Sequence, residues 1–149
     1  MPFIEWKESH RIGVEKLDED HRHLLDLANE LHAGIARSHG DGGFEDVVDE
    51  LRTMLHVLDG LIDYATDHFA SEEECMLEHD CPDYAEMKQA HEQFMSLAQD
   101  LRRAFDEGRA LSSQEILESI KEWFETHVLG LDMRFGEFVN RLGIQNMVA

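Results

Sequence analysis

Hydrophobic residues recur every three or four positions through most of the chain, which predicts amphipathic helices rather than strands. Short stretches containing glycine, proline or aspartate separate four such segments. We expect helices over about residues 18–38, 44–79, 83–107 and 112–142, preceded by an extended arm over about residues 1–16. Each helix has one apolar face, and all four faces must be buried against one another.

Signals at the helix ends support these ranges. Asp18 is a candidate N-cap for the first helix, and Ser112-Ser113-Gln114-Glu115 has the spacing of a capping box for the fourth. Gly143 marks the expected end of the fourth helix. Four helices joined by short loops predict an all-α, up-down-up-down four-helix bundle. We expect residues 1–149 to form a single domain.

Polar residues interrupt the apolar face of every predicted helix. These residues are His21, His68, Glu72, His91 and His127. Burying an unpaired imidazole or carboxylate costs several kcal/mol. A metal ion shared by these side chains removes that cost, and imidazole with carboxylate suits first-row metals such as iron and zinc. The pattern therefore predicts a metal site on the bundle axis.

A sixth candidate ligand, Asp132, follows His127 by five residues rather than four. Residues five apart on an ideal α-helix point about 140° away from each other. The two side chains can converge if the helix is locally distorted, and Gly130 between them would ease a π-bulge. We therefore expect a distorted turn over this part of the fourth helix.

The charge of the chain narrows the classes of partner. The chain has 33 acidic and 13 basic residues, for a formal charge of −20, which argues against binding nucleic acid or an anionic membrane surface. The chain contains no run of about 18 apolar residues, so we expect no membrane span. Its N-terminus lacks the pattern of a signal peptide. We expect a cytoplasmic protein. Cys75 and Cys81 are six residues apart, and in a reducing compartment we expect both to be free thiols.

Several short motifs occur together in a fixed order. They are Trp6 with Ile12-Gly13-Val14, Leu17-Asp18-Glu19-Asp20-His21, residues 64–73 with Met76, Cys81-Pro82-Asp83-Tyr84, His91-Glu92-Gln93-Phe94, residues 123–127, and Asp132. This ordered set resembles the bacterial single-domain hemerythrins over nearly the whole length of the chain. No single motif is diagnostic, but their order, spacing and placement on helices are highly specific.

The resemblance implies a site with two irons that are bridged by two carboxylates and an oxo or hydroxo group. Glu72 and Asp132 correspond to the bridging carboxylates. His21 and His68 correspond to the ligands of the iron that binds O2. Within the acidic run 72–74, only Glu72 is expected to face inward.

The second iron of that family takes three histidines, and this chain departs from the pattern there. His91 and His127 correspond to two of them, and Met87 stands one turn before His91 where the third is expected. A thioether is a soft donor that matches ferric iron poorly. Water could complete the site, Met87 or a nearby carboxylate (Glu86 or Asp83) could ligate, or the second metal could bind weakly.

Three functions are consistent with this reading. The first is a non-haem iron protein that binds O2 for storage, delivery or sensing, without enzymatic activity. The second is an oxidase or peroxidase-like enzyme that uses the altered site. The third is a signalling module, in which the state of the metal changes the packing of helices. No organic substrate pocket is evident from the sequence, and the acidic surface favours a monomer.

Overall fold

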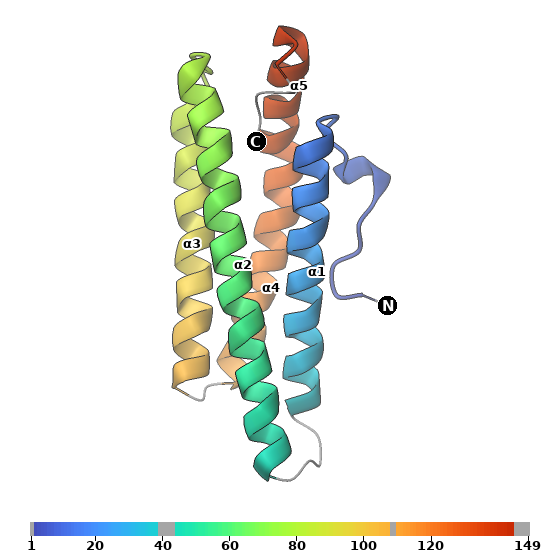
Figure 1. Ribbon diagram of the computed structural model, residues 1–149, viewed down its shortest axis with the longest axis vertical. Helices are drawn as coiled ribbons and strands as arrows, with labels where there is room; N and C mark the ends of the chain where they lie inside the picture. The colour runs from blue at the N-terminus through green and yellow to red at the C-terminus, as the bar shows by residue number, and fades with distance from the viewer. Residues whose placement is uncertain (1, 39–43, 108–109, 145–149) are drawn as a thin grey trace.

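The helices predicted from the sequence form a closed bundle of four rods (Figure 1). The computed structural model describes residues 2–38, 44–107 and 110–144. Over these residues the elements are η1 (Glu8–His10), α1 (Glu15–Ser38), α2 (Phe44–Glu78), α3 (Tyr84–Asp106), α4 (Ala110–His127), η2 (Val128–Asp132) and α5 (Met133–Leu142). The last three run on without a break as the fourth rod. Each rod contacts the next, and α4 also contacts α1, which confirms the all-α four-helix bundle.

The first helix begins earlier than the sequence predicts. Helix α1 starts at Glu15, so the prediction that Asp18 is its N-cap is wrong. The backbone N–H of Asp18 already donates to the carbonyl of Val14 at 2.9 Å. Its carboxylate instead accepts a hydrogen bond from the backbone N–H of Ile12 at 2.8 Å. Asp18 thus lies inside the first turn of the helix and accepts the hydrogen bond of a backbone N–H just before it.

The fourth rod also begins earlier than expected. Helix α4 starts at Ala110, so Ser112 lies within the helix and the predicted capping box does not open it. Ala110 and Leu111 both have high helix propensity, which favours extending the helix to include them. At the other end, Gly143 adopts the left-handed conformation (φ 68°) that commonly ends a helix, as expected.

The turn between α2 and α3 has a regular helix-ending motif. Asp80 is left-handed (φ 54°), and the backbone N–H of Cys81 donates to the carbonyl of Met76 at 2.9 Å. Both helix ends at this turn lie within one residue of the predicted positions. Cys75 and Cys81 are free, as expected, and the structure buries both.

The N-terminal arm packs along the bundle rather than extending into solvent. Asn29 of α1 binds both backbone groups of Ile4, accepting from its N–H at 2.7 Å and donating to its carbonyl at 2.9 Å. Further along the arm, the backbone of Ile12 lies so close to Gly136 of α5 that any side chain at position 136 would collide with it. Over its described residues the arm contains one short 3-10 turn, η1, and no other helix or strand before α1.

The core consists of two apolar clusters with a polar layer between them. One cluster includes Leu17, Met76 and Phe135, and the other includes Phe94 and Ile120. The buried polar residues of the rods lie in sequence between members of the two clusters. The polar layer is therefore a desolvated site enclosed above and below by hydrophobic side chains.

None of the described helices is long and apolar enough to cross a membrane.

Candidate metal centre

The six candidate ligands gather into two groups in the polar layer. The ligand atoms of each group lie within 4.8 Å of one another, and all six side chains are at most 5% exposed. The first group comes from α1 and α2, and the second from α3, α4 and the π-helical turn η2. The first group is His21, His68 and Glu72, and the second group is His91, His127 and Asp132. Every rod of the bundle contributes at least one side chain.

Asp132 connects the two groups. One of its carboxylate oxygens lies 3.1 Å from Nε2 of His21, and the other lies 3.1 Å from Nε2 of His127. Residues Val128–Asp132 form one turn of π-helix, which brings Asp132 onto the buried face. The predicted distortion is thus confirmed, and one carboxylate faces an imidazole from each group.

The polar atoms at the centre of this layer have no hydrogen-bond partner. This is true of Nε2 of all four histidines, both oxygens of Glu72 and one oxygen of Asp132. Buried polar atoms in folded proteins are nearly always paired. Here the donors and acceptors face one another across short distances without hydrogen-bond geometry, as ligands do around a shared cation. Nitrogen and carboxylate donors in this ratio suit iron, so the residues fit a pair of iron ions.

The protonation equilibria of the site also reflect buried charge. Burial, followed by the neighbouring Asp132, raises the pKa of Glu72. Burial disfavours the charged form of Asp132, but His127 and His21 outweigh it and hold the pKa of Asp132 well below its usual value. Burial and then His127 lower the pKa of His91 to about 3. The imidazole of His91 is therefore neutral and able to bind a metal at ordinary pH.

A hydrogen-bond network around the buried carboxylate of Asp20 orients His68 of the first group. Nδ1–H of His68 donates to one oxygen of Asp20 at 2.8 Å, so its Nε2 faces the site. The other oxygen of Asp20 accepts from the Tyr64 hydroxyl and from the Lys16 ammonium, each at 2.6 Å. Carboxylates that fix the tautomer of a ligand histidine in this way strengthen metal binding. The sequence placed Asp20 beside His21 but gave no sign that it contacts His68.

His91 of the second group has a carboxylate partner of its own. Nδ1–H of His91 donates to Glu73 at 2.9 Å. The expectation that only Glu72 in the acidic run faces inward is therefore wrong, because the α2 backbone turns Glu73 toward α3. The Glu73 side chain is 21% exposed, whereas that of Asp20 is 5% exposed.

Aromatic rings stack on both imidazoles of the second group. Trp123 stacks on His127 with ring centroids 4.3 Å apart, and Phe69 stacks on His91 at 3.9 Å. The indole N–H of Trp123 donates to the carbonyl of Ala90 at 3.0 Å, which ties α4 to α3. These rings fix the planes of two imidazoles in the second group.

Met87 is fully buried, one turn before His91 on α3. It packs in the apolar cluster that contains Met76 and Phe135. The two nearby carboxylates that are candidate replacement ligands face away from the site. Glu86 and Asp83 both pair with Arg134, at 3.0 Å and 3.5 Å, on the outside of the bundle. Neither carboxylate belongs to the buried groups.

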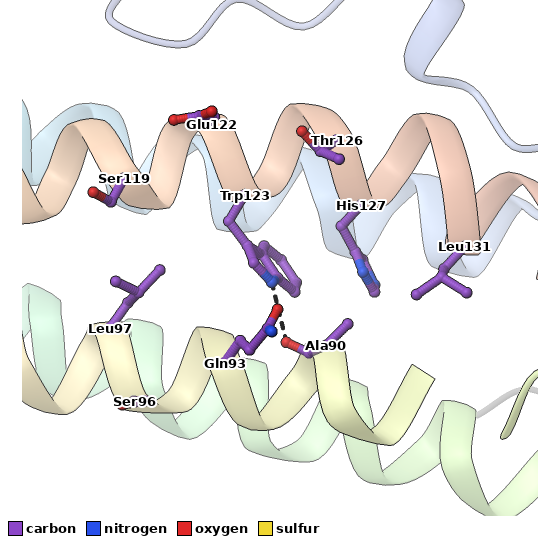
Figure 2. Close-up of a pocket in the computed structure, with 10 residues that line it drawn as sticks. All are labelled: Ala90, Gln93, Ser96, Leu97, Ser119, Glu122, Trp123, Thr126, His127 and Leu131. Atoms are coloured by element: carbon purple, nitrogen blue, oxygen red, sulfur yellow. Dashed lines mark hydrogen bonds between the residues drawn. The ribbon is translucent and has the colours of Figure 1, made fainter. Parts of the chain in front are cut away.

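A cavity that the sequence did not reveal borders the second group. It lies between α3 and α4 with a volume of about 650 Å³, and Figure 2 shows His127 and Trp123 projecting into the space between these helices. Its lining includes Ala90, Gln93 and Leu97 from α3 and Trp123, Thr126 and His127 from α4. No organic substrate pocket is evident from the sequence, and the volume of this one lies in the range of small-molecule sites.

Comparison with known proteins identifies the class. Residues 12–138 match the hemerythrin HHE cation binding domain, so the chain belongs to the hemerythrin family. Hemerythrins are non-haem iron proteins that bind O2 and are not enzymes, and they bind iron at a diiron site. This agrees with the resemblance found in the sequence and with the two ligand groups described above.

Individual relatives span most of the chain. A bacteriohemerythrin from Stenotrophomonas maltophilia is 29% identical over 139 residues, covering 93% of this chain and 83% of that protein. A myohemerythrin from Theromyzon tessulatum is 26% identical, covering 88% of this chain and 89% of that protein. A crystal structure of a hemerythrin mutant superposes with a TM-score of 0.75 at 27% identity, covering 92% of this chain and 97% of that one.

Proposed function

We propose that this protein binds O2 at a carboxylate-bridged diiron site in the core of the bundle, for storage, delivery or sensing. The observation that carries the proposal is the position of Asp132, which faces an imidazole from each of two buried ligand groups. Two three-residue groups joined by one carboxylate suit two metal ions better than one. The bound irons would supply the electrons and coordination positions that O2 binding requires.

The side chains around the ligands support reversible binding in several ways. Asp20 and Glu73 hold the outer nitrogens of His68 and His91, so the inner nitrogens are directed at the metals. The stacked rings of Trp123 and Phe69 fix the planes of the His127 and His91 imidazoles. A rigid set of ligands rearranges little when a small molecule binds or leaves.

Metal analysis with spectroscopy tests this function. The protein is purified without air, its metal content per chain is measured, and its absorption spectrum is recorded as O2 is admitted and removed. We expect about two irons per chain and a visible band that appears and disappears reversibly. About one iron per chain, or zinc in its place, would contradict the diiron proposal.

A second candidate function is an oxidase or peroxidase-like activity at the same irons. The observation that favours it is Met87, which adds no nitrogen donor to the second group. Catalytic consumption of O2 or peroxide in the presence of a reductant would support this candidate. Binding without consumption would exclude it. Under the same hypothesis, replacing Met87 by His should lengthen the lifetime of the oxygenated form.

We also propose that the protein is a monomer. Its formal charge of −20 opposes the approach of a second copy. Sedimentation velocity at low and at high salt tests this proposal. A dimer at both salt concentrations would contradict it. The cytoplasmic location stays a prediction from the sequence.

A further inference from the structure

The two ligand groups offer metals the same donors. Each group has two imidazoles and one carboxylate, and Asp132 faces both groups. Two imidazoles with one carboxylate are typical of non-haem iron sites that keep positions open for exogenous ligands. The protein alone therefore fills the coordination positions of neither metal, and ligands from solvent would complete both.

No other described side chain supplies a nitrogen or oxygen donor to the second group in place of the missing one. Met87 occupies the inner face of α3 one turn before His91 and packs among apolar side chains. The carboxylates of Glu86 and Asp83 are held outside by Arg134. The outer nitrogen of His91 is bound to Glu73, so this imidazole has one nitrogen left for a metal.

Cavities reach the second group from two sides. The cavity between α3 and α4 is lined by His127, and a cavity of about 360 Å³ between α2 and α3 is lined by His91 and Glu73. Neither cavity is lined by a residue of the first group. The outer edges of the two imidazoles of the second group therefore border solvent-filled space, whereas their metal-facing Nε2 atoms are buried.

From this arrangement we propose that the metal held by His91, His127 and Asp132 takes up a small monodentate anion of its own. The proposal rests on the proposed diiron site and adds a second ligand-binding position to it. The protein with both irons then binds two anions per chain, one at each metal. Met87 is the residue that leaves this second position available.

Azide is a suitable probe because it binds ferric iron and has an infrared band that reports its surroundings. The iron-loaded protein is oxidised in air, its iron content is measured, and bound azide is counted by equilibrium dialysis. Infrared spectra with ¹⁵N-labelled azide show whether the anions occupy one environment or two. We expect two azides for two irons in the natural chain, in two distinct environments.

Two variants at one position assign the second anion. Met87→His adds an imidazole to the second group, and we expect it to bind one azide for two irons. Met87→Leu is the matched control, which removes the thioether without adding a donor, and we expect it to bind two. The count for the natural chain stands as a test even if Met87→His does not fold.

The possible outcomes separate this inference from the proposed function. Two irons with only one azide in the natural chain would overturn the inference and leave the diiron site intact. One azide in the natural chain but two in Met87→Leu would overturn it by showing that the thioether fills the position. Two azides in Met87→His would also overturn it. Fewer than two irons would overturn the diiron proposal together with this inference.

Discussion

The two ligand groups use the same donor chemistry but are supported differently by the protein. Behind the first group, Asp20 is nearly fully buried and accepts hydrogen bonds from three side chains, those of His68, Tyr64 and Lys16. Behind the second group, Glu73 is partly exposed, and cavities border both imidazoles. A buried carboxylate with three partners resists rearrangement more than a partly exposed one does. The comparison indicates a rigid first position and a more accessible second one.

The largest effect is expected where the groups meet. Asp132→Asn removes the charge that faces an imidazole from each group, so both metals should be lost. We expect metal binding to weaken by more than the roughly 100-fold that outer residues contribute, measured by chelator competition. Asp67→Asn, an exposed change beside His68, is the control. Retention of one tightly bound metal in Asp132→Asn would show that Asp132 serves a single group.

Asp20→Asn should weaken metal binding by the first group alone. The substitution keeps the shape of the side chain but removes the charge that fixes the His68 ring. We expect one of the two metals to bind about 10- to 100-fold more weakly, seen as one shifted step in a chelator titration. Asp26→Asn, exposed on the same helix, should leave both steps unchanged. A shift of both steps would remove the distinction between the groups.

Glu73→Gln makes the corresponding change behind the second group and should have a smaller effect. Solvent can replace part of the interaction because the carboxylate is partly exposed. We expect a loss of about tenfold or less in the affinity of the second metal, measured in the same titration. Glu74→Gln is the neighbouring exposed control. A loss larger than that caused by Asp20→Asn would reverse the comparison.

The smallest effect is expected from Tyr64→Phe. This change removes one of the hydrogen bonds to Asp20 and leaves those of His68 and Lys16 in place. We expect the metal-free protein to lose about 1 kcal/mol of unfolding free energy, measured by urea denaturation. Tyr84→Phe provides a control of the same chemistry. No loss relative to that control would mean that the buried network does not stabilise the fold.

The sequence predicted the helices and the ligand side chains for the same reason. Polar residues such as His91 and Glu72 interrupt an otherwise apolar helix face, and a periodic pattern reveals both the face and the interruption. The π-helical turn was predicted because the spacing between His127 and Asp132 does not suit an α-helix. Helix starts were predicted less accurately. Asp18 has the side chain of a typical N-cap, but it lies inside α1 and accepts a hydrogen bond from the backbone N–H of Ile12 before the helix.

The supporting residues could not be predicted from periodicity. Asp20 binds His68, which lies 48 residues away, and only the packing of α1 against α2 brings the two together. Glu73 stands in a run of acidic residues that is typical of a solvated surface, yet its helix turns it toward His91. One general signal was available, because a ligand imidazole nearly always donates its second nitrogen to a partner. The cavities depend on how side chains from two helices fit together, which no single segment encodes.

The π-helical turn has a consequence beyond the metal centre. It holds one residue more than an α-helical turn, so everything after it is rotated by about 100° relative to an uninterrupted helix. This rotation about the helix axis decides which side of α5 faces the arm, and on that side Gly136 lies against the backbone of Ile12. Removing a single residue from the turn, such as the exposed Leu129, would misdirect Asp132 and also push a side chain into the arm. Ligand placement and closure of the N-terminal segment are thus set by the same inserted residue.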